Sequence, residues 1–169
     1  MTSEARPRDE KTEAIWQLLS ELEDPEIPAL TLMDLGIIRE INLEPDGRVE
    51  VVLTTTYTAC PATHFIELLV AEKLEDAGYE FKLTTKLTPT WTTDWISEEG
   101  RRKLREYGIA PPITATTSKK VLMGAKLEIE CPQCRSSRTT RISEFGSTPC
   151  KSLYKCDDCA EPFEYFKCI

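Results

Sequence analysis

Cys131-Pro132-Gln133-Cys134 and Cys156-Asp157-Asp158-Cys159 decide the fold of the C-terminal part of this chain. Each is a C-x-x-C pair, and 21 residues separate Cys134 from Cys156. A C-x-x-C turn directs two sulfurs at one point, and two such turns complete the tetrahedron of thiolates that Zn²⁺ favours. Since four protein ligands leave no open position, the site should hold a fold together and do no chemistry. The expected zinc ligands are Cys131, Cys134, Cys156 and Cys159.

Composition places the chain in a reducing compartment. The segment from Met1 to Lys11 is polar, with charges of both signs, which is unlike a signal peptide. No apolar run approaches the roughly 18–20 residues that span a bilayer, so we expect a cytoplasmic protein without membrane contact. In that compartment the 7 cysteines favour metal binding over disulfides.

The charge distribution argues against a nucleic-acid partner. The formal net charge is −8, and residues 126–169 carry seven basic and seven acidic side chains, so the whole excess lies in residues 1–125. A zinc module that binds nucleic acid needs a surface that neutralises phosphates. We therefore expect a structural or protein-facing zinc ribbon.

The N-terminal part reads as an α-β-β-α-β module with a helical extension. Apolar residues at helical spacing predict a helix over 12–23, and alternation predicts a hairpin with strands at 37–43 and 49–53. A second helix begins at Pro61 and stops before Gly78, and Ser97 caps a third that runs through Tyr107. A strand over 80–88 lies between these two helices. The fold class is α+β, a small sheet with helices on one face.

The boundaries follow from composition. Residues 1–108 form the α+β domain, residues 109–125 a linker rich in Pro, Thr, Ser and Lys, and residues 126–169 the zinc ribbon. Short ribbon strands are expected at 127–130, 139–143, 153–156 and 163–167.

Cys60 stands where a strand ends and a helix begins, in Thr54-Thr55-Thr56-Tyr57-Thr58-Ala59-Cys60-Pro61-Ala62. The positive end of a helix favours a thiolate, so its thiol should be more acidic than a free cysteine and able to bind metal transiently. The alternative is a buried, inert small side chain. Spacing alone leaves the two readings balanced.

Several other side chains are weaker site residues. Glu26 and Asp34 belong to acidic turns and could orient a ligand, although turn-forming residues are the simpler reading. His64 lies one helical turn after Cys60, and Cys150 and Cys168 remain once the zinc quartet is assigned. A ribbon that folds back on the first domain would join these three to Cys60 in a second metal site; the alternative is spare thiols and an ordinary surface histidine.

The chain lacks the sequence patterns of common enzymes. It has no phosphate-binding Gly loop, no G-x-S-x-G and no H-E-x-x-H, so a carrier, scaffold or assembly protein is expected before an enzyme. Trp91 and Trp95 precede a highly charged helix. They are expected to dock a partner, with core packing as the default alternative.

The ordered motifs resemble a known family. Residues 24–28 (Asp-Pro-Glu-Ile-Pro), 33–38 and 56–62 are similar to the iron–sulfur assembly domain of SufT-like proteins. With residues 91–112 and 143–168, the chain resembles the D subunits (PaaD-like) of bacterial phenylacetyl-CoA 1,2-epoxidase, over nearly the whole length after residue 12. Thr55 departs from this pattern, because the family often has Pro there.

The resemblance implies an accessory, non-catalytic role in aerobic phenylacetate degradation. The protein would assemble or repair an iron or iron–sulfur centre, with Cys60 as transient ligand of iron or a cluster. Its partners would be the epoxidase's catalytic di-iron subunit or its iron–sulfur reductase, and a homodimer stays open. Two alternatives are a rubredoxin-like electron carrier and a permanent structural subunit of the oxygenase. Arg135 argues against the first, because rubredoxin usually has glycine at the position after the second cysteine.

Overall fold

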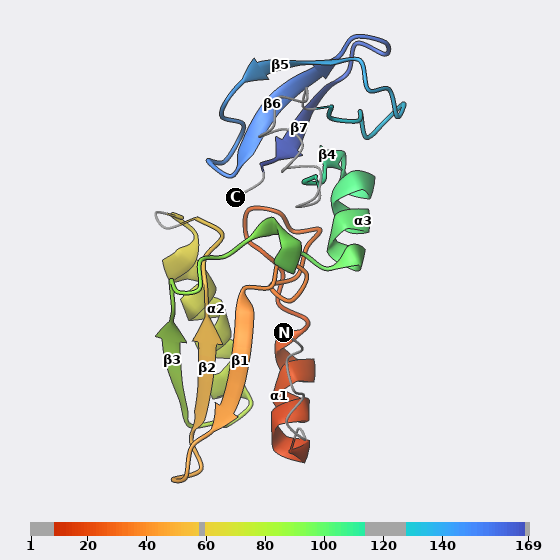
Figure 1. The fold of residues 1–169 in the computed structure, drawn as a ribbon. Helices are drawn as coiled ribbons and strands as arrows, with labels where there is room; N and C mark the ends of the chain where they lie inside the picture. Colours follow the sequence, from red (N-terminus) through yellow and green to blue (C-terminus); the bar gives the residue numbers. More distant parts are fainter. Residues whose placement is uncertain (1–8, 58–59, 114–127, 168–169) are drawn as a thin grey trace.

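The computed structural model describes residues 9–57, 60–113 and 128–167, which form two modules, each built on its own sheet (Figure 1). Within these residues the first sheet has the strand order β1-β2-β3 and the second the order β4-β7-β6-β5. The second module stacks on one end of the first, and the loop that follows the first helix lies between them (Figure 1). The predicted class, an α+β module followed by a small β module, is confirmed.

The first sheet grows from the predicted hairpin. β1 (Ile38–Leu43) pairs antiparallel with β2 (Val49–Leu53), which pairs parallel with β3 (Phe81–Thr85). Residues three apart on a regular strand face opposite sides, but a bulge in β1 lets both Ile38 and Ile41 be buried. The parallel pair needs a crossover, which the second helix supplies.

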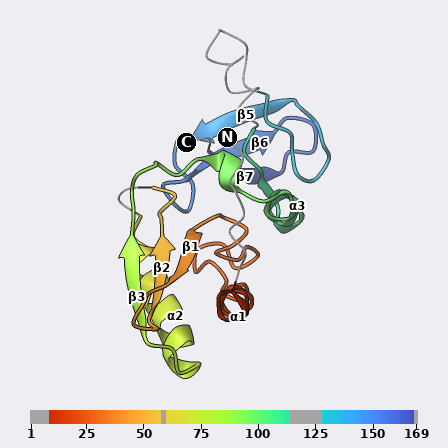
Figure 2. The ribbon, with the colours of Figure 1, turned by 60° about the horizontal axis from the view of Figure 1, so that its bottom comes forward.

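Two helices cover this sheet. α1 (Glu10–Leu19) and α2 (Thr63–Asp76) contact each other and the strands, and α2 runs along one face of the sheet (Figures 1 and 2). The prediction that the first helix continues to residue 23 was wrong. The hydroxyl of Ser20 donates to the carbonyl of Gln17 at 2.7 Å, and the chain then turns into a β-bridge between residues 23 and 31.

The loop of residues 20–37 lies at the end of the first module that faces the second (Figure 1) and buries Leu30, Leu32 and Leu35. Gly36 has φ +65°, a conformation that favours glycine. A Cβ at Gly36 would also lie 2.9 Å from the carbonyl oxygen of Trp95. The loop is therefore fixed against the segment that precedes the third helix.

The docking prediction for the tryptophans was wrong at Trp91. Its side chain is 2% exposed, and its indole N–H donates to the carbonyl of Leu35 at 2.8 Å. Trp95 forms part of a short 3₁₀ helix, η1 (Thr93–Trp95), and the guanidinium of Arg39 covers its ring at 3.6 Å from the centroid. The Thr-rich segment thus folds back over the loop and fills the core with its first indole.

The third helix begins and ends as predicted. In α3 (Glu98–Tyr107) the hydroxyl of Ser97 accepts the N–H of Gly100 at 2.8 Å, and Gly108 ends the helix at φ +91°. β4 (Ile109–Ala110) follows at once and pairs parallel with β7 of the second sheet. The first residues of the predicted linker therefore form a strand.

The second sheet consists of β4 and an antiparallel meander. The meander comprises β5 (Thr139–Ser143), β6 (Lys151–Cys156) and β7 (Pro162–Phe166), close to the predicted strands. A strand was also expected over 127–130. Residues 128–130 are irregular and bury Ile129, while residue 127 lies outside the described part of the chain.

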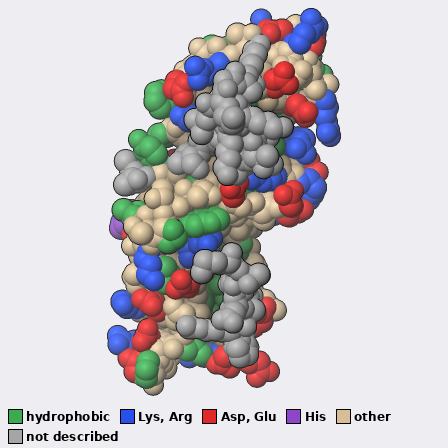
Figure 3. Space-filling view, in the orientation of Figure 1, with side chains coloured by type: hydrophobic (Ala, Val, Ile, Leu, Met, Phe, Trp, Pro, Cys, Tyr) green, Lys and Arg blue, Asp and Glu red, His purple; other side chains and the backbone are tan. Residues whose placement is uncertain are grey.

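The two modules share the larger hydrophobic core, and the second module also has a smaller core of its own. Phe166 at the end of β7 is 1% exposed and belongs to the core of the first module, as does Cys150 just before β6. Acidic and basic side chains interleave over both modules on the face seen in Figure 3. No described helix is both long and apolar enough to cross a bilayer.

Candidate functional site

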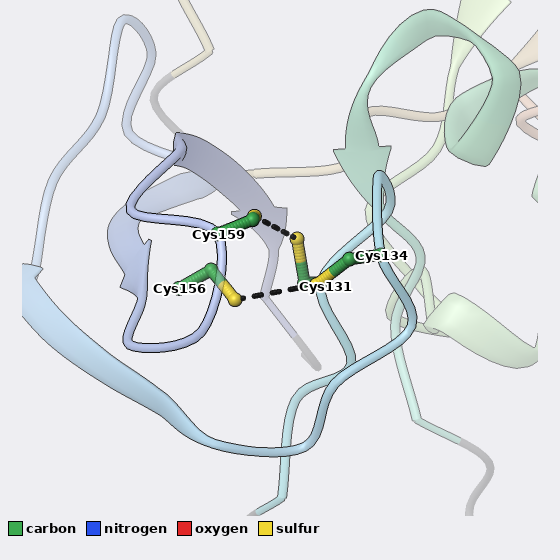
Figure 4. Close-up of side chains that lie close together, drawn as sticks. All are labelled: Cys131, Cys134, Cys156 and Cys159. Carbon is green, nitrogen blue, oxygen red and sulfur yellow. Dashed lines mark hydrogen bonds between the residues drawn. The ribbon is translucent and has the colours of Figure 1, made fainter.

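Four cysteines converge in the second module. The sulfurs of Cys131, Cys134, Cys156 and Cys159 all lie within 4.8 Å of one another. They come from two loops and point toward a common centre (Figure 4). The closest contacts are 3.7 Å between Cys131 and Cys159 and 3.5 Å between Cys134 and Cys156.

This arrangement fits a tetrahedral metal. Zn–S bonds of about 2.3 Å at tetrahedral angles require S···S edges of about 3.8 Å. The two measured contacts are close to that edge, and thiolate is the donor that zinc prefers. The four side chains are thus suited to hold one ion with no open position.

The two cysteine turns each end in a residue of left-handed conformation. Arg135 and Ala160, each directly after the second cysteine of its pair, both have φ +64°. The N–H of Arg135 donates to the carbonyl of Cys131 at 2.9 Å. The turn therefore forms without glycine, so the argument from Arg135 against a rubredoxin-like iron site carries no weight.

A second site lies where the modules meet. A pocket there is lined by parts of the loop before β1, the end of β2, the start of α2 and the second module. Its cavity volume is about 20 Å³, enough for one water-sized group but not for an organic substrate. Its lining includes Cys60 and the whole Thr54–Thr56 run from the first module, and Cys150 and Phe166 from the second.

Cys60 lies on the N-terminal side of α2, three residues before the helix begins. Its N–H donates to the carbonyl of Tyr57 at 2.9 Å, and its own carbonyl accepts the hydroxyl of Thr63 at 2.9 Å. The predicted acidity was wrong. Burial raises the pKa of the Cys60 thiol, and nearby Glu26 adds to this, although the N–H of Ala62 favours the thiolate.

The acidic turn of residues 24–26 brings two carboxyl groups to the same pocket. The side chain of Asp24 accepts the N–H groups of Glu26 and Ile27 at 2.9 and 2.8 Å. Burial raises the pKa of Asp24. Burial and the charge of Asp24 raise the pKa of Glu26. The structure therefore places the predicted Glu26 beside Cys60, together with Asp24, which the sequence reading did not select.

Asp34 has a different environment. Its carboxylate accepts the ammonium of Lys103 at 2.7 Å, the hydroxyl of Ser97 at 2.9 Å and two groups of Thr31. Burial alone would raise its pKa, but these hydrogen bonds, first that of Lys103, lower the pKa below its usual value. Asp34 does not line the pocket, and it ties the loop to α3.

The proposed second metal set is only partly assembled. Cys150 reaches the pocket from the second module, with its sulfur 3.1 Å from the hydroxyl of Thr148. His64 does not line the pocket; its side chain is 82% exposed and lies 3.9 Å from Glu67. Cys168 lies outside the described residues. The six described cysteines are free thiols.

Two buried hydroxyl groups near Cys60 were not predicted from the sequence. The Oγ1 atoms of Thr54 and Thr55 are buried and have no hydrogen-bond partner within the described structure. Both residues line the pocket. The sequence signal that could have identified them is the run of three threonines before Cys60. A single threonine at a strand end is common, whereas three in succession are not.

Comparisons with known proteins match both modules. Residues 12–80 match the model of an iron–sulfur cluster assembly protein family, and residues 115–167 match the PaaD zinc beta ribbon domain. The chain is 46% identical over 156 residues, 92% of each protein, to an Escherichia coli (strain K12) protein provisionally named as the D subunit of 1,2-phenylacetyl-CoA epoxidase.

Two further relatives resemble the first module. An Fe-S protein maturation auxiliary factor of Porphyromonas gingivalis is 38% identical over 96 residues, which cover 54% of this chain and 89% of that protein. The crystal structure of domain of unknown function DUF59 from Bacillus anthracis superposes with a TM-score of 0.51 at 19% identity, covering 54% of this chain and 89% of that one. The latter supports the fold alone.

Proposed function

This chain belongs to the family of the D subunit of 1,2-phenylacetyl-CoA epoxidase, and on that premise we propose that it is an accessory factor for an iron-containing centre of this oxygenase. The protein assembles or repairs the centre and does not itself carry out the oxygenation. Its similarity to an Fe-S protein maturation auxiliary factor supports the same class of activity. The expected partners are the catalytic di-iron subunit and the iron–sulfur reductase.

One observation carries this proposal: Cys60 is a free, half-buried thiol in a pocket with room for an ion and with acidic neighbours. Thiolate is the ligand of iron–sulfur clusters and of soft metals. The raised pKa leaves the thiol protonated until a cation arrives and displaces the proton. Such a group takes iron as cargo and can return it to a partner.

The ribbon acts as a scaffold. Its four cysteines would hold Zn²⁺ as a closed structural ion, and Phe166 fixes the ribbon to the first module. Zinc there supplies folding free energy. The ribbon thus presents one side of the pocket instead of supplying a reactive metal.

The test is a strain in which the gene encodes Cys60→Ser. We expect a folded, zinc-containing protein, an oxygenase with reduced iron content and activity, and poor growth on phenylacetate. His64→Ala is the matched control, because His64 lies on the same helix start but points to solvent. Full oxygenase iron and activity with Cys60→Ser would refute the proposal and favour a structural subunit that remains in the complex.

A rubredoxin-like carrier makes a different prediction for the same preparation. Iron in the cysteine quartet would colour the protein red, and this colour would bleach on reduction. Metal and acid-labile sulfide analysis of anaerobically purified protein distinguishes zinc from iron at these four ligands.

A further inference from the structure

The junction pocket contains thiols from both modules. Cys60 lies just before α2 and Cys150 just before β6, and both line the same small cavity. Cys150 is 7% exposed and packs in the shared core beside Phe166. Because the ribbon contributes one of the two thiols, neither module has the complete site alone.

The charges around the cavity favour a cation. The ionisable side chains among its described lining residues are all acids: Asp24, Glu26, Glu67, Cys60 and Cys150. The charge of Lys151 acts on Asp24, Glu26 and Cys150, but its ammonium, 3% exposed, already lies 2.8 Å from the carboxylate of Glu164. One paired lysine leaves these acids in excess, and a bound cation would compensate the cost of burying their ionised forms.

A buried hydroxyl also lacks a partner at this point. Thr54 is 4% exposed, lines the cavity, and its Oγ1 makes no hydrogen bond within the described structure. Leaving such a group unpaired destabilises the folded protein. A bound ion would satisfy it by accepting the hydroxyl oxygen as a ligand, in a space that admits one water-sized group.

The donor set defines the class of ion. Thiolates select borderline and soft metals, whereas Mg²⁺ and Ca²⁺ take oxygen ligands only. We infer that Cys60 and Cys150, with the carboxylate of Glu26, form a binding site for a divalent thiophilic cation of the Fe²⁺ class between the modules. Each bound ion displaces one proton from each thiol, so that M²⁺ and two thiols give a dithiolate complex and two protons.

The ligand atoms of the junction pocket are less closely gathered than those of the zinc quartet. Among the described residues, only the quartet gathers three or more such ligand atoms within 4.8 Å. The pocket ligands must move inward to bind, which weakens binding and permits release. This inference deepens the proposed function, since it identifies the ribbon as the donor of the second ligand to the cargo ion.

The test uses the full chain with its zinc in place, under anaerobic conditions, with Co²⁺ as the probe. We expect one Co²⁺ per chain beyond the zinc, seen as thiolate-to-cobalt charge-transfer absorption. Cys150→Ser should bind at least tenfold more weakly and with about half the absorption per cobalt, because one thiolate of two is lost. His64→Ala should match the wild type, as this side chain does not line the pocket.

Zinc content of one per chain before and after titration shows that cobalt has not entered the ribbon. If Cys150→Ser loses zinc or fails to fold, Glu26→Gln takes its place, and it too should weaken cobalt binding. Wild-type binding by Cys150→Ser in a folded protein, or by Glu26→Gln, overturns the inference, as does the lack of a second cobalt in the wild type. The Cys60→Ser growth assay is independent, so either claim can fail while the other stands.

Discussion

The ring of Trp91 lies 6.1 Å from that of Phe166, centroid to centroid, and the rings are tilted by 50°. Trp91 belongs to the first module and Phe166 to the last strand of the second, and both are almost fully buried. Aromatic pairs at this distance and tilt contribute beyond their buried area. The junction is therefore a packed core, and the two modules should unfold together.

Replacing Trp91 tests this junction. Trp91→Ala removes the ring and its hydrogen bond to Leu35, so we expect the free energy of unfolding to fall by about 3–5 kcal/mol. Urea denaturation followed by circular dichroism measures it. Tyr107→Ala is the control, because Tyr107 is 58% exposed and should change stability by less than ~0.5 kcal/mol. Equal effects of the two changes would contradict the packed junction.

Loss of one quartet ligand should unfold the second sheet. Structural zinc in such modules contributes on the order of 10–16 kcal/mol near neutral pH, so Cys156→Ser should abolish amide protection across β5, β6 and β7. Hydrogen exchange measures this directly. Because Phe166 packs in the shared core, the first module should also lose stability. Cys150→Ser is the control and should keep its zinc, because Cys150 does not belong to the quartet. Retained protection in Cys156→Ser would exclude a structural quartet.

Asp34 should make stability depend on pH. Its pKa is lowered in the folded protein, so its contribution is complete above the unfolded value of about 3.9 and is lost as pH falls through the folded pKa. Asp34→Asn, which removes the ion pair with Lys103, should cost about 1–3 kcal/mol at neutral pH. Its effect should shrink in acid. A pH-independent difference from the wild type would refute the ion-pair explanation.

The hydroxyl of Thr54 should destabilise the protein when the junction pocket holds no ion. Thr54→Val keeps the shape and removes an unpaired buried group, so the free energy of unfolding with the pocket empty should rise by up to ~1–3 kcal/mol. Thr12→Val is the matched control, because the hydroxyl of Thr12 donates to the carbonyl of Asp9 at 2.7 Å and its loss should destabilise. Thermal unfolding of the zinc-containing protein, with no other metal added, measures both. A destabilised Thr54→Val would show that Thr54 has a partner of its own.

Local patterns were predictable where local chemistry dominates. The spacing of Cys131, Cys134, Cys156 and Cys159 predicted one four-sulfur cluster, because each C-x-x-C turn fixes two sulfurs by itself. The cap at Ser97 and the stop at Gly108 were also correct, since caps depend on adjacent residues. The first helix was too long in the prediction, because a bridge formed by residues 23 and 31 competes with helical hydrogen bonds.

The environment of individual side chains was decided by the tertiary structure. Helix position alone suggested an acidic Cys60, but burial and the neighbouring carboxylates reverse the shift. Exposure of Trp91 was inferred from a polar neighbourhood, whereas the indole fills the junction. Asp34 and Glu26 looked alike in sequence, and only the fold separates a carboxylate in an ion pair from one that lines the pocket.

The sequence by itself determined the two modules, most of their helices and strands and the zinc-type quartet, because these depend on periodicity and on contacts between residues near in the chain. Only the tertiary structure brought Cys150 to the pocket of Cys60, since nothing local links a ribbon strand to a helix start 90 positions earlier. Packing of Phe166 against Trp91 makes that meeting possible, because burial of these two rings holds the modules together.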